Sequence, residues 1–357
     1  MHKMKPIPFK TCLLVLFLTG CWTCSKDRDD QTLPAVNDFA ANAIRRTWAS
    51  FSGSADSALV DYSMIFGVCL NTTGDPKISD TVYVGSVYET RFSVNAGDLQ
   101  PSTTYYVRWY VSDISNIRYG AVETIKTMPA GLIVTFNASK TYGSITDIEG
   151  NVYKTIDIGN QTWMAENLKT TRLNDNNEIP FVTGNSNWMS QHSPAYSWYE
   201  DNEDIYRDIY GAYYNWYTVN TGKLCPSGWH VPSDDEWQTL ELEMGIPAEY
   251  LNYAGIRGTT EGLKLMEAGT GNWITEEALT GTNESGFTAL PGGMRVGANY
   301  YGDFDFSEGW SASWWTSRYE YYAYFHALYS AVPGIYKGAN LREFGRNVRC
   351  VKDQLGK

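Results

Sequence analysis

The chain has 357 residues, and its 40 acidic and 28 basic side chains give a formal net charge of -12 at pH 7. This charge argues against nucleic acid as a partner, because a polyanion would be repelled, whereas neutral glycans, peptides and cations stay open as ligands. Aromatic residues make up 15% of the chain and charged residues 19%, with 32 glycines, which indicates a loop-rich and β-rich protein of two or three domains.

The N-terminus has the features of a secretion signal. Lysines at positions 3, 5 and 10 precede an apolar stretch of about ten residues that ends at Leu18-Thr19-Gly20-Cys21. Such a stretch is too short to span about 30 Å of hydrocarbon but is typical of a secretory signal. The three lysines disfavour the alternative, a short buried helix. The pattern resembles a bacterial lipoprotein signal, which implies removal of residues 1–20 and acylation of Cys21.

The residues after this cysteine predict a flexible tether and the cellular location of the protein. Residues 21–33 are polar and charged, with nothing to bury, and we expect a flexible segment there. Acidic residues behind a lipidated cysteine resemble the surface-export signals of Bacteroidetes-type lipoproteins. We therefore expect a lipoprotein of the outer membrane, held there by its lipid and exposed at the cell surface.

Short β-runs separated by turns dominate residues 34–128. They cover residues 62–70, 82–87, 90–94, 104–111 and 121–127. Residues 99–105 form a Leu-x-Pro-x-Thr-x-Tyr pattern that resembles the tyrosine corner of a fibronectin type III sandwich, in which a tyrosine hydroxyl bonds to upstream backbone. Tyr105 is the candidate for that tyrosine. The resemblance implies a β-sandwich that serves as a spacer, with ligand binding by this domain as the alternative.

The cysteines predict one disulfide. An exported protein can form disulfides, and Cys225 and Cys350 lie in the same C-terminal domain. Closing so long a loop stabilises a fold by roughly 5 kcal/mol, so we predict that these two cysteines pair. Cys69 lies in an apolar run and is expected to be a buried free thiol, while Cys24 lies in the tether.

Residues 129–139 are expected to form a linker, residues 140–353 a second domain and residues 354–357 a tail. This second domain opens on a predicted β-hairpin over residues 147–168, whose turn residues lie at 149–151 and 159–161.

One helix of the second domain has clear end signals. Ser233 and Glu236 form a capping box at its start, and Gly245 ends it. Its apolar residues fall on one face, which we expect to be buried; they are Trp237, Leu240 and Met244.

A series of blocks in this domain resembles, in order, the Fibrobacter succinogenes major paralogous (FISUMP) domain. The blocks are residues 147–168, 210–217, 224–237, 285–293, 314–317 and 347–351. The resemblance implies a C-type-lectin-like α+β fold, in the branch shared with formylglycine-generating enzymes, with residues 314–315 and 347–351 in central strands. The fold class expected for the whole chain is therefore mainly β, a sandwich followed by an α+β domain.

Aromatic side chains are dense between residues 300 and 325. Sugar rings stack on exposed tyrosine and tryptophan, so we predict Tyr300, Tyr301 and Tyr321 as ligand-binding residues on loops. Trp314 and Trp315 are expected to be structural. The most favoured function is non-catalytic recognition of a glycan.

Two acidic loops were considered as Ca²⁺ sites, because crowded carboxylates suit that ion. The residues are Asp201, Glu203, Asp204, Asp303 and Asp305. Neither spacing matches an EF-hand, and the Glu-Pro-Asn and Gln-Pro-Asp motifs of calcium-dependent lectins do not occur in the chain. Solvated loops are the favoured interpretation, and no cofactor is predicted.

No nucleophile elbow, zinc-protease or phosphate-loop motif occurs in the sequence. His230 is expected to be a packed, hydrogen-bonded residue, and Cys350 has only Cys225 as a local partner, unlike the copper-binding cysteine pair of formylglycine-generating enzymes. We therefore predict no enzyme. Two alternatives stay open: a protein that contacts another protein in adhesion or surface assembly, and a hydrolase or modifying enzyme, for which Glu166, Glu276 and Glu277 were considered.

Overall fold

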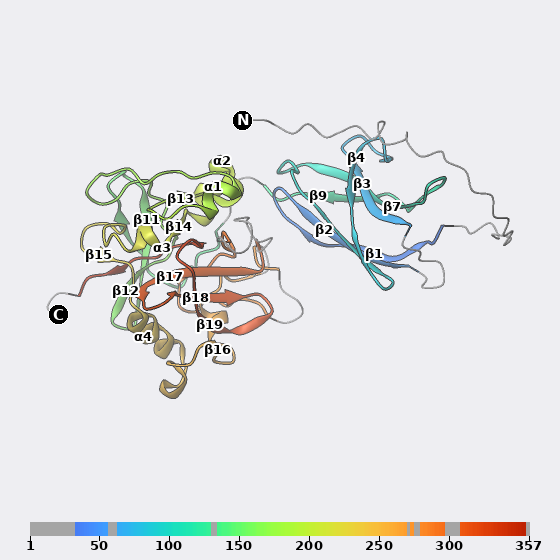
Figure 1. Ribbon diagram of the computed structural model, residues 1–357. Coiled ribbons are helices and arrows are strands. Elements are labelled where there is room, and N and C mark those ends of the chain that lie inside the picture. The colour runs from blue at the N-terminus through green and yellow to red at the C-terminus, as the bar shows by residue number, and fades with distance from the viewer. Residues whose placement is uncertain are drawn as a thin grey trace.

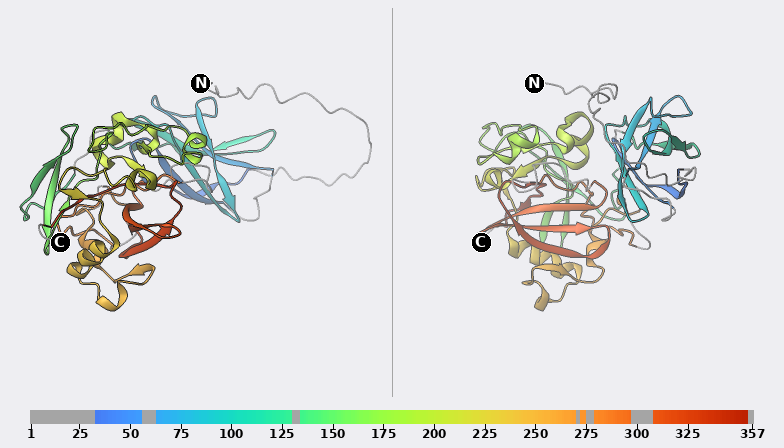
Figure 2. Two further views of the ribbon diagram at one scale, coloured as in Figure 1. Left: turned by 60° about the vertical axis from the view of Figure 1, so that its left-hand side comes forward. Right: turned by 45° about the vertical axis from the view of Figure 1, so that its right-hand side comes forward.

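The computed structural model describes residues 33–55, 63–129, 134–269, 272–274, 279–296 and 308–354. The predicted lipoprotein signal and Cys21 lie outside these residues. A β-sandwich and a larger C-terminal domain lie side by side (Figures 1 and 2). Within the described ranges, no helix has the length and apolar character that crossing a membrane requires.

The N-terminal domain is a sandwich of two antiparallel sheets around one core. The first sheet has the order β1 (Val36–Ile44), β2 (Ala49–Ala55), β6 (Arg91–Ala96) and β5 (Ser86–Tyr88). The second has the order β4 (Thr81–Val84), β3 (Ile65–Asn71), β7 (Thr104–Ser112) and β8 (Ile117–Tyr119), and β9 (Glu123–Lys126) also pairs with β7. Burial alternates along β2 and β6, because successive side chains of a strand point to opposite faces.

Two local predictions for this domain are confirmed. The Tyr105 hydroxyl accepts a hydrogen bond from the Gln100 backbone N–H at 2.8 Å, as a tyrosine corner requires. Cys69 is a buried free thiol. The run predicted over 82–87 instead divides at Gly85 into two strands of opposite sheets. A β-carbon there would meet the Ser93 carbonyl oxygen at 2.7 Å.

Strands β1 and β2 were not predicted from the sequence. Residues of low β-propensity fill much of β1 and β2, whose sequences are VNDFAANAI and ASFSGSA. They form strands because Phe51 and Ala49 pack into the sandwich core, which is a tertiary effect.

The C-terminal domain is built from three small antiparallel sheets and short helices. One sheet has the order β10 (Gly143–Thr146), β11 (Val152–Ile158), β12 (Gln161–Met164), β21 (Val351–Lys352) and β15 (Trp229–His230). A second has β13 (Tyr196–Ser197), β14 (Tyr213–Asn215) and β20 (Gly345–Arg346). The third has β16 (Gly255–Arg257), β19 (Val332–Asn340), β18 (Ala323–Tyr329) and β17 (Ser311–Tyr319).

The helices connect and cover these sheets. They are α1 (Asn185–Met189), η2 (Tyr199–Asp201), α2 (Glu203–Tyr210), α3 (Trp216–Val219), α4 (Asp234–Met244), η3 (Ala248–Tyr250) and η4 (Glu261–Lys264). Helix α4 has both hydrogen bonds of the predicted capping box, between Ser233 and Glu236, and ends at Gly245 with a φ of 108°. Its predicted apolar face is buried.

Helix α4 also buries charges that its sequence did not reveal. His326 Nδ1 lies 2.7 Å from Glu241 and its Nε2 lies 3.2 Å from Asp234, while the ring stacks on Trp237 at 4.8 Å. Lys337 Nζ lies 2.6 Å from Asp234. Partners from β18 and β19 therefore satisfy carboxylates that would otherwise be costly to bury.

The strand that contains Trp314 and Trp315 was expected in the centre of a sheet but lies at an edge. Trp314 and Trp315 are buried, as expected for structural residues, but β17 ends its sheet and is not central. Irregular backbone covers the free edge, because single bridges join Ala312 to Gly293 and Trp314 to Asn347. Residue 351 does lie in a central strand, since β21 pairs with β12 and β15.

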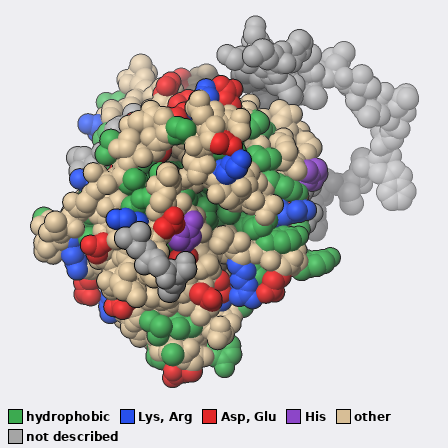
Figure 3. All heavy atoms as spheres, turned by 90° about the vertical axis from the view of Figure 1, so that its left-hand side faces the viewer, with side chains coloured by type: hydrophobic (Ala, Val, Ile, Leu, Met, Phe, Trp, Pro, Cys, Tyr) green, Lys and Arg blue, Asp and Glu red, His purple; other side chains and the backbone are tan. Residues whose placement is uncertain are grey.

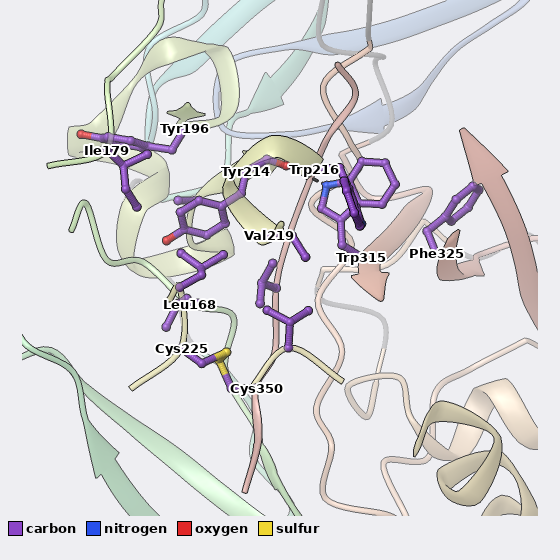
Figure 4. Close-up of a cluster of buried hydrophobic side chains, with 14 of the residues drawn as sticks. Leu168, Ile179, Tyr196, Tyr214, Trp216, Val219, Cys225, Trp315, Phe325 and Cys350 are labelled. Carbon is purple, nitrogen blue, oxygen red and sulfur yellow. Dashed lines mark hydrogen bonds between the residues drawn. A yellow bond between two sulfur atoms is a disulfide. The ribbon is translucent and has the colours of Figure 1, made fainter. Parts of the chain in front are cut away.

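The predicted disulfide between Cys225 and Cys350 is confirmed. Both cysteines are buried in a hydrophobic cluster. Figure 4 shows the disulfide at one end of this cluster near Leu168, with Trp216 and Trp315 farther along it.

The two domains share a buried contact. The turn between β1 and β2 places Arg46, which is almost fully buried, 2.7 Å from the Glu308 carboxylate of the C-terminal domain. Trp48 Nε1 and the Tyr210 hydroxyl donate to the same carboxylate at 3.1 and 2.9 Å. Thr47 donates to Glu200 at 2.8 Å. An ion pair and hydrogen bonds thus join the sandwich, which was expected to be a spacer, to the C-terminal domain.

Candidate ligand-binding surface

An exposed group of tyrosines lies at the tip of the hairpin formed by β17 and β18. The exposed fractions are 81% for Tyr321, 43% for Tyr322 and 40% for Tyr319. The rings of Tyr321 and Tyr322 pack edge to face, with centroids 5.0 Å apart. The hairpin places aromatic rings in solvent directly beyond a strand whose tryptophans are buried.

Helix α3 and the segment after β19 extend this group on one side. Trp216 stacks on Tyr319 with centroids 4.8 Å apart. The Arg342 guanidinium lies over the rings of Tyr217 and Tyr319, at 4.6 and 5.3 Å from their centroids. We call Tyr217, Tyr319, Tyr321, Tyr322 and Arg342 the tyrosine surface.

Local chemistry fixes the position of Trp216 and Tyr217. Asn215 is the N-cap of α3, and its side chain accepts from the Thr218 backbone N–H at 3.1 Å. The Trp216 backbone N–H donates to the Arg342 carbonyl at 2.9 Å, which ties α3 to the segment that carries the arginine. Hydrogen bonds therefore hold the two segments that carry Tyr217 and Arg342 next to each other.

Polar groups flank the hairpin on its other side. Arg318 donates to Glu320 at 2.5 Å and to Asp234 at 2.9 Å, and its guanidinium lies over the Tyr324 ring at 4.3 Å. Aromatic faces with hydrogen-bonding groups at their edges are what a sugar ring requires, because its C–H face is apolar and its hydroxyls are polar.

Of the three ligand-binding residues predicted from sequence, the structure places Tyr321 on this surface. Tyr300 and Tyr301 lie outside the described residues, as do Asp303 and Asp305. Tyr217 and Arg342 were missed. Tyr217 closes the block 210–217 and Arg342 lies outside the blocks, and neither position carries a ligand-binding pattern, so only the fold brings them beside the hairpin.

Two of the acidic residues that are candidates for Ca²⁺ binding, Asp201 and Glu203, have other partners in the structure. Asp201 forms an ion pair with Arg295 and accepts from the Gly184 N–H at 2.7 Å. Glu203 lies 3.6 Å from Arg207, and Asp204 is exposed. In the ranges that the structure describes, no three histidine, cysteine or acidic side chains gather as a metal site would require.

Of the three glutamates named as alternatives for catalysis, the structure describes Glu166. Glu166 accepts from the Lys154 backbone N–H at 2.6 Å, and Glu276 and Glu277 lie outside the described residues.

On the face shown in Figure 3, acidic and basic side chains are interspersed among neutral and apolar ones.

His230 is hydrogen-bonded as expected, but it is not packed inside the domain. Its Nδ1 lies 2.6 Å from Asp353 and its Nε2 lies 2.8 Å from Glu236, so it links the end of β21 to the start of α4. The hydrogen bond to Glu236 and the second carboxylate raise the pKa of His230 from 6.5 to about 9. The imidazolium is the favoured form in the folded protein at neutral pH.

This pKa predicts how the histidine contributes to stability across the pH range. Because the folded pKa lies above the unfolded one, the contribution is complete below pH 6.5 and is lost as pH rises through 9. With 41% of the side chain exposed, we expect about 1 kcal/mol after solvent screening. The variant His230→Gln should therefore unfold more easily in urea than the wild type at pH 6, and equally at pH 10. A difference that stays constant between these pH values would contradict the prediction.

Comparison with known proteins identifies the C-terminal part of the chain. The sequence profile of the family described as Fibrobacter succinogenes major domain matches residues 156–352. Among solved structures, the fibronectin type III domain of human fibronectin type III domain containing protein 3 is 16% identical, with a TM-score of 0.22, over 30% of this chain and 94% of that domain. The sensor domain of the anti-sigma factor RsgI4 in Pseudobacteroides cellulosolvens is 18% identical, with a TM-score of 0.21, over 29% of this chain and 79% of that one. No curated protein matches the sequence.

Proposed function

This chain belongs to the Fibrobacter succinogenes major domain family, and from the surface found within the matched region we propose that it is a non-catalytic, glycan-binding protein of the cell surface. Membership of a family does not determine what a protein binds, so the proposal is argued from the site. The observation that carries it is the set of solvent-exposed tyrosine rings at the tip of the hairpin between β17 and β18.

These rings suit a sugar better than a large apolar partner. Tyr321 and Tyr322 each offer a flat face and a hydroxyl, so they can stack on C–H groups and bond to sugar hydroxyls. Tyr319 stacks on Trp216 and lies under Arg342, and it adds its exposed edge. Arg318 and Glu320 add a charged donor and acceptor at the hairpin edge. An open surface of this kind favours an internal stretch of a polysaccharide over a small molecule enclosed in a pocket.

The proposed location is the outer membrane, with lipid on Cys21 as the anchor and the domains facing outward. The buried disulfide between Cys225 and Cys350 supports export, because such bonds persist in oxidising compartments. The proposal includes no cofactor, no nucleic acid and no catalytic residue.

A second candidate function is contact with another protein through the sandwich. The strands β4 and β5 carry exposed apolar side chains, of which Val84 is 65% and Tyr88 78% exposed. Exposed apolar strands of this kind favour protein contact, in adhesion or surface assembly.

Affinity electrophoresis through gels that contain soluble polysaccharides tests the first function. We expect at least one polysaccharide to retard the mature chain, and Tyr321→Ala to weaken that binding about fivefold, since loss of one stacking contact costs about 1 kcal/mol. Tyr88→Ala, which removes an equally exposed tyrosine from the sandwich, is the matched control and should bind as the wild type does. The proposal fails if no polysaccharide retards the chain, or if both variants lose binding equally.

A further inference from the structure

We propose that Arg342 binds a carboxylate of the ligand, so that the glycan recognised by the tyrosine surface contains acidic sugars such as uronic acids. This inference rests on the proposed function and names the class of sugar. It comes from the position of one arginine relative to the carboxylates of the domain.

Arg342 differs from the other accessible arginines. The C-terminal domain contains eight arginines, of which four are buried and four are partly exposed. Three of the partly exposed ones form ion pairs: Arg172 with Glu178, Arg207 with Asp208, and Arg318 with Asp234. The fourth, Arg342, has no carboxylate within ion-pair distance among the described residues. In an acidic protein this leaves a guanidinium with unused donors.

The nearest acidic side chain in sequence is already engaged. The Glu343 carboxylate accepts from the Tyr217 hydroxyl at 2.8 Å and lies 3.0 Å from His192 Nδ1. These hydrogen bonds lower the pKa of Glu343, although burial opposes them, so it stays ionised at neutral pH. It holds the hydroxyl of the Tyr217 ring on which Arg342 lies, and among the described residues it forms no ion pair with the guanidinium.

The two rings hold the guanidinium ready for a planar ligand. Arg342 lies over Tyr217 and Tyr319, which restricts its side chain before a ligand arrives. Its N–H groups can donate to both oxygens of one carboxylate, a geometry that arginine provides and lysine does not. A carboxylate on a sugar that contacts the exposed edge of Tyr319 would meet these donors.

The net charge of the whole protein limits how acidic such a glycan can be. At a formal charge of -12, the protein repels a densely charged polymer, so the site suits carboxylates spaced among neutral sugars. The ion pair should also weaken as ionic strength rises, whereas stacking should not.

Binding of matched acidic and neutral polysaccharides tests the inference. Glucuronoxylan, whose carboxylates are spaced among neutral sugars, is the main probe, and polygalacturonate and alginate are densely charged comparisons. Each would be compared with its own carboxyl-reduced form, which keeps the sugar skeleton and removes the charge. We expect the mature chain to bind at least one acidic form about tenfold more tightly than its reduced form. Arg342→Gln should abolish that preference, so that this variant binds the acidic and the reduced form with equal affinity, while Arg342→Lys should keep only part of the preference. Arg91→Gln, which removes an exposed arginine of the sandwich, should have no effect.

The results separate this inference from the proposed function. Equal binding of acidic and reduced forms, or an acidic preference that survives in Arg342→Gln, overturns the role of Arg342 and leaves glycan binding intact. Absence of binding to every acidic, reduced and neutral polysaccharide overturns both. Unfolding midpoints measured for each variant show whether the substitution acts on binding alone.

Discussion

Replacing both Cys225 and Cys350 with alanine is expected to lower the free energy of unfolding by about 5 kcal/mol. The two cysteines are 125 residues apart in sequence, so their bond removes a large amount of conformational entropy from the unfolded chain. The bond also lies inside the hydrophobic cluster shown in Figure 4, where Cys350 is fully buried. A loss of this size is a large part of the stability of an ordinary domain.

Urea unfolding followed by tryptophan fluorescence measures this loss. A reducing agent provides the control: it should destabilise the wild type to the level of the double variant and leave the variant unchanged. If the wild type under reducing conditions and the variant both stay within about 1 kcal/mol of the oxidised protein, the disulfide does not stabilise the fold as the chain-entropy account requires.

Substitution of Arg46 by methionine is expected to cost about 3–5 kcal/mol, because it leaves the buried Glu308 carboxylate without its cation. The Glu308 side chain is fully buried, and among the described residues the hydrogen-bond donors left to it would be Trp48 and Tyr210. The contact joins the sandwich to the C-terminal domain, so the loss should appear as weaker coupling between the unfolding transitions of the two domains.

A double-mutant cycle distinguishes this ion pair from simple loss of packing. Replacing both Arg46 and Glu308 with methionine should restore much of the stability lost in Arg46→Met, since no unpaired charge is then buried. Arg91→Met, on the exposed side of the sandwich, is the control and should change stability by less than about 0.5 kcal/mol. Additive losses in the double variant would show that the two charges do not stabilise one another.

The position of the sandwich changes how the molecule would present its ligand. A sandwich without contacts to the C-terminal domain would let that domain rotate relative to it. The contacts of Arg46, Thr47 and Trp48 instead hold the two domains in one arrangement. With the sandwich fixed, the tyrosine surface keeps a constant direction relative to the N-terminal strands.

Several features were predictable from the residues because the forces that produce them act over a few positions or have few partners to choose from. The Tyr105 corner, the Ser233 and Glu236 capping box and the stop at Gly245 each depend on hydrogen bonds or backbone angles within about five residues. The disulfide was predictable because the C-terminal domain holds only two cysteines. The family blocks likewise identified the second domain. Its C-type-lectin likeness, the acylation of Cys21 and the glycan ligand stay predictions.

Other features came from contacts between residues far apart in the chain, and no local pattern could reveal them. Strands β1 and β2 form because their few apolar residues reach the sandwich core, against weak intrinsic propensity. Arg46 meets Glu308 across 262 residues, and His326 meets Glu241 across 85. Arg342 reaches the ring of Tyr217 only because α3 bonds to the backbone after β19. Burial of charge and stacking of a cation both depend on which side chains the folded chain brings within a few ångströms of one another. The packing of the whole domain determines those neighbours.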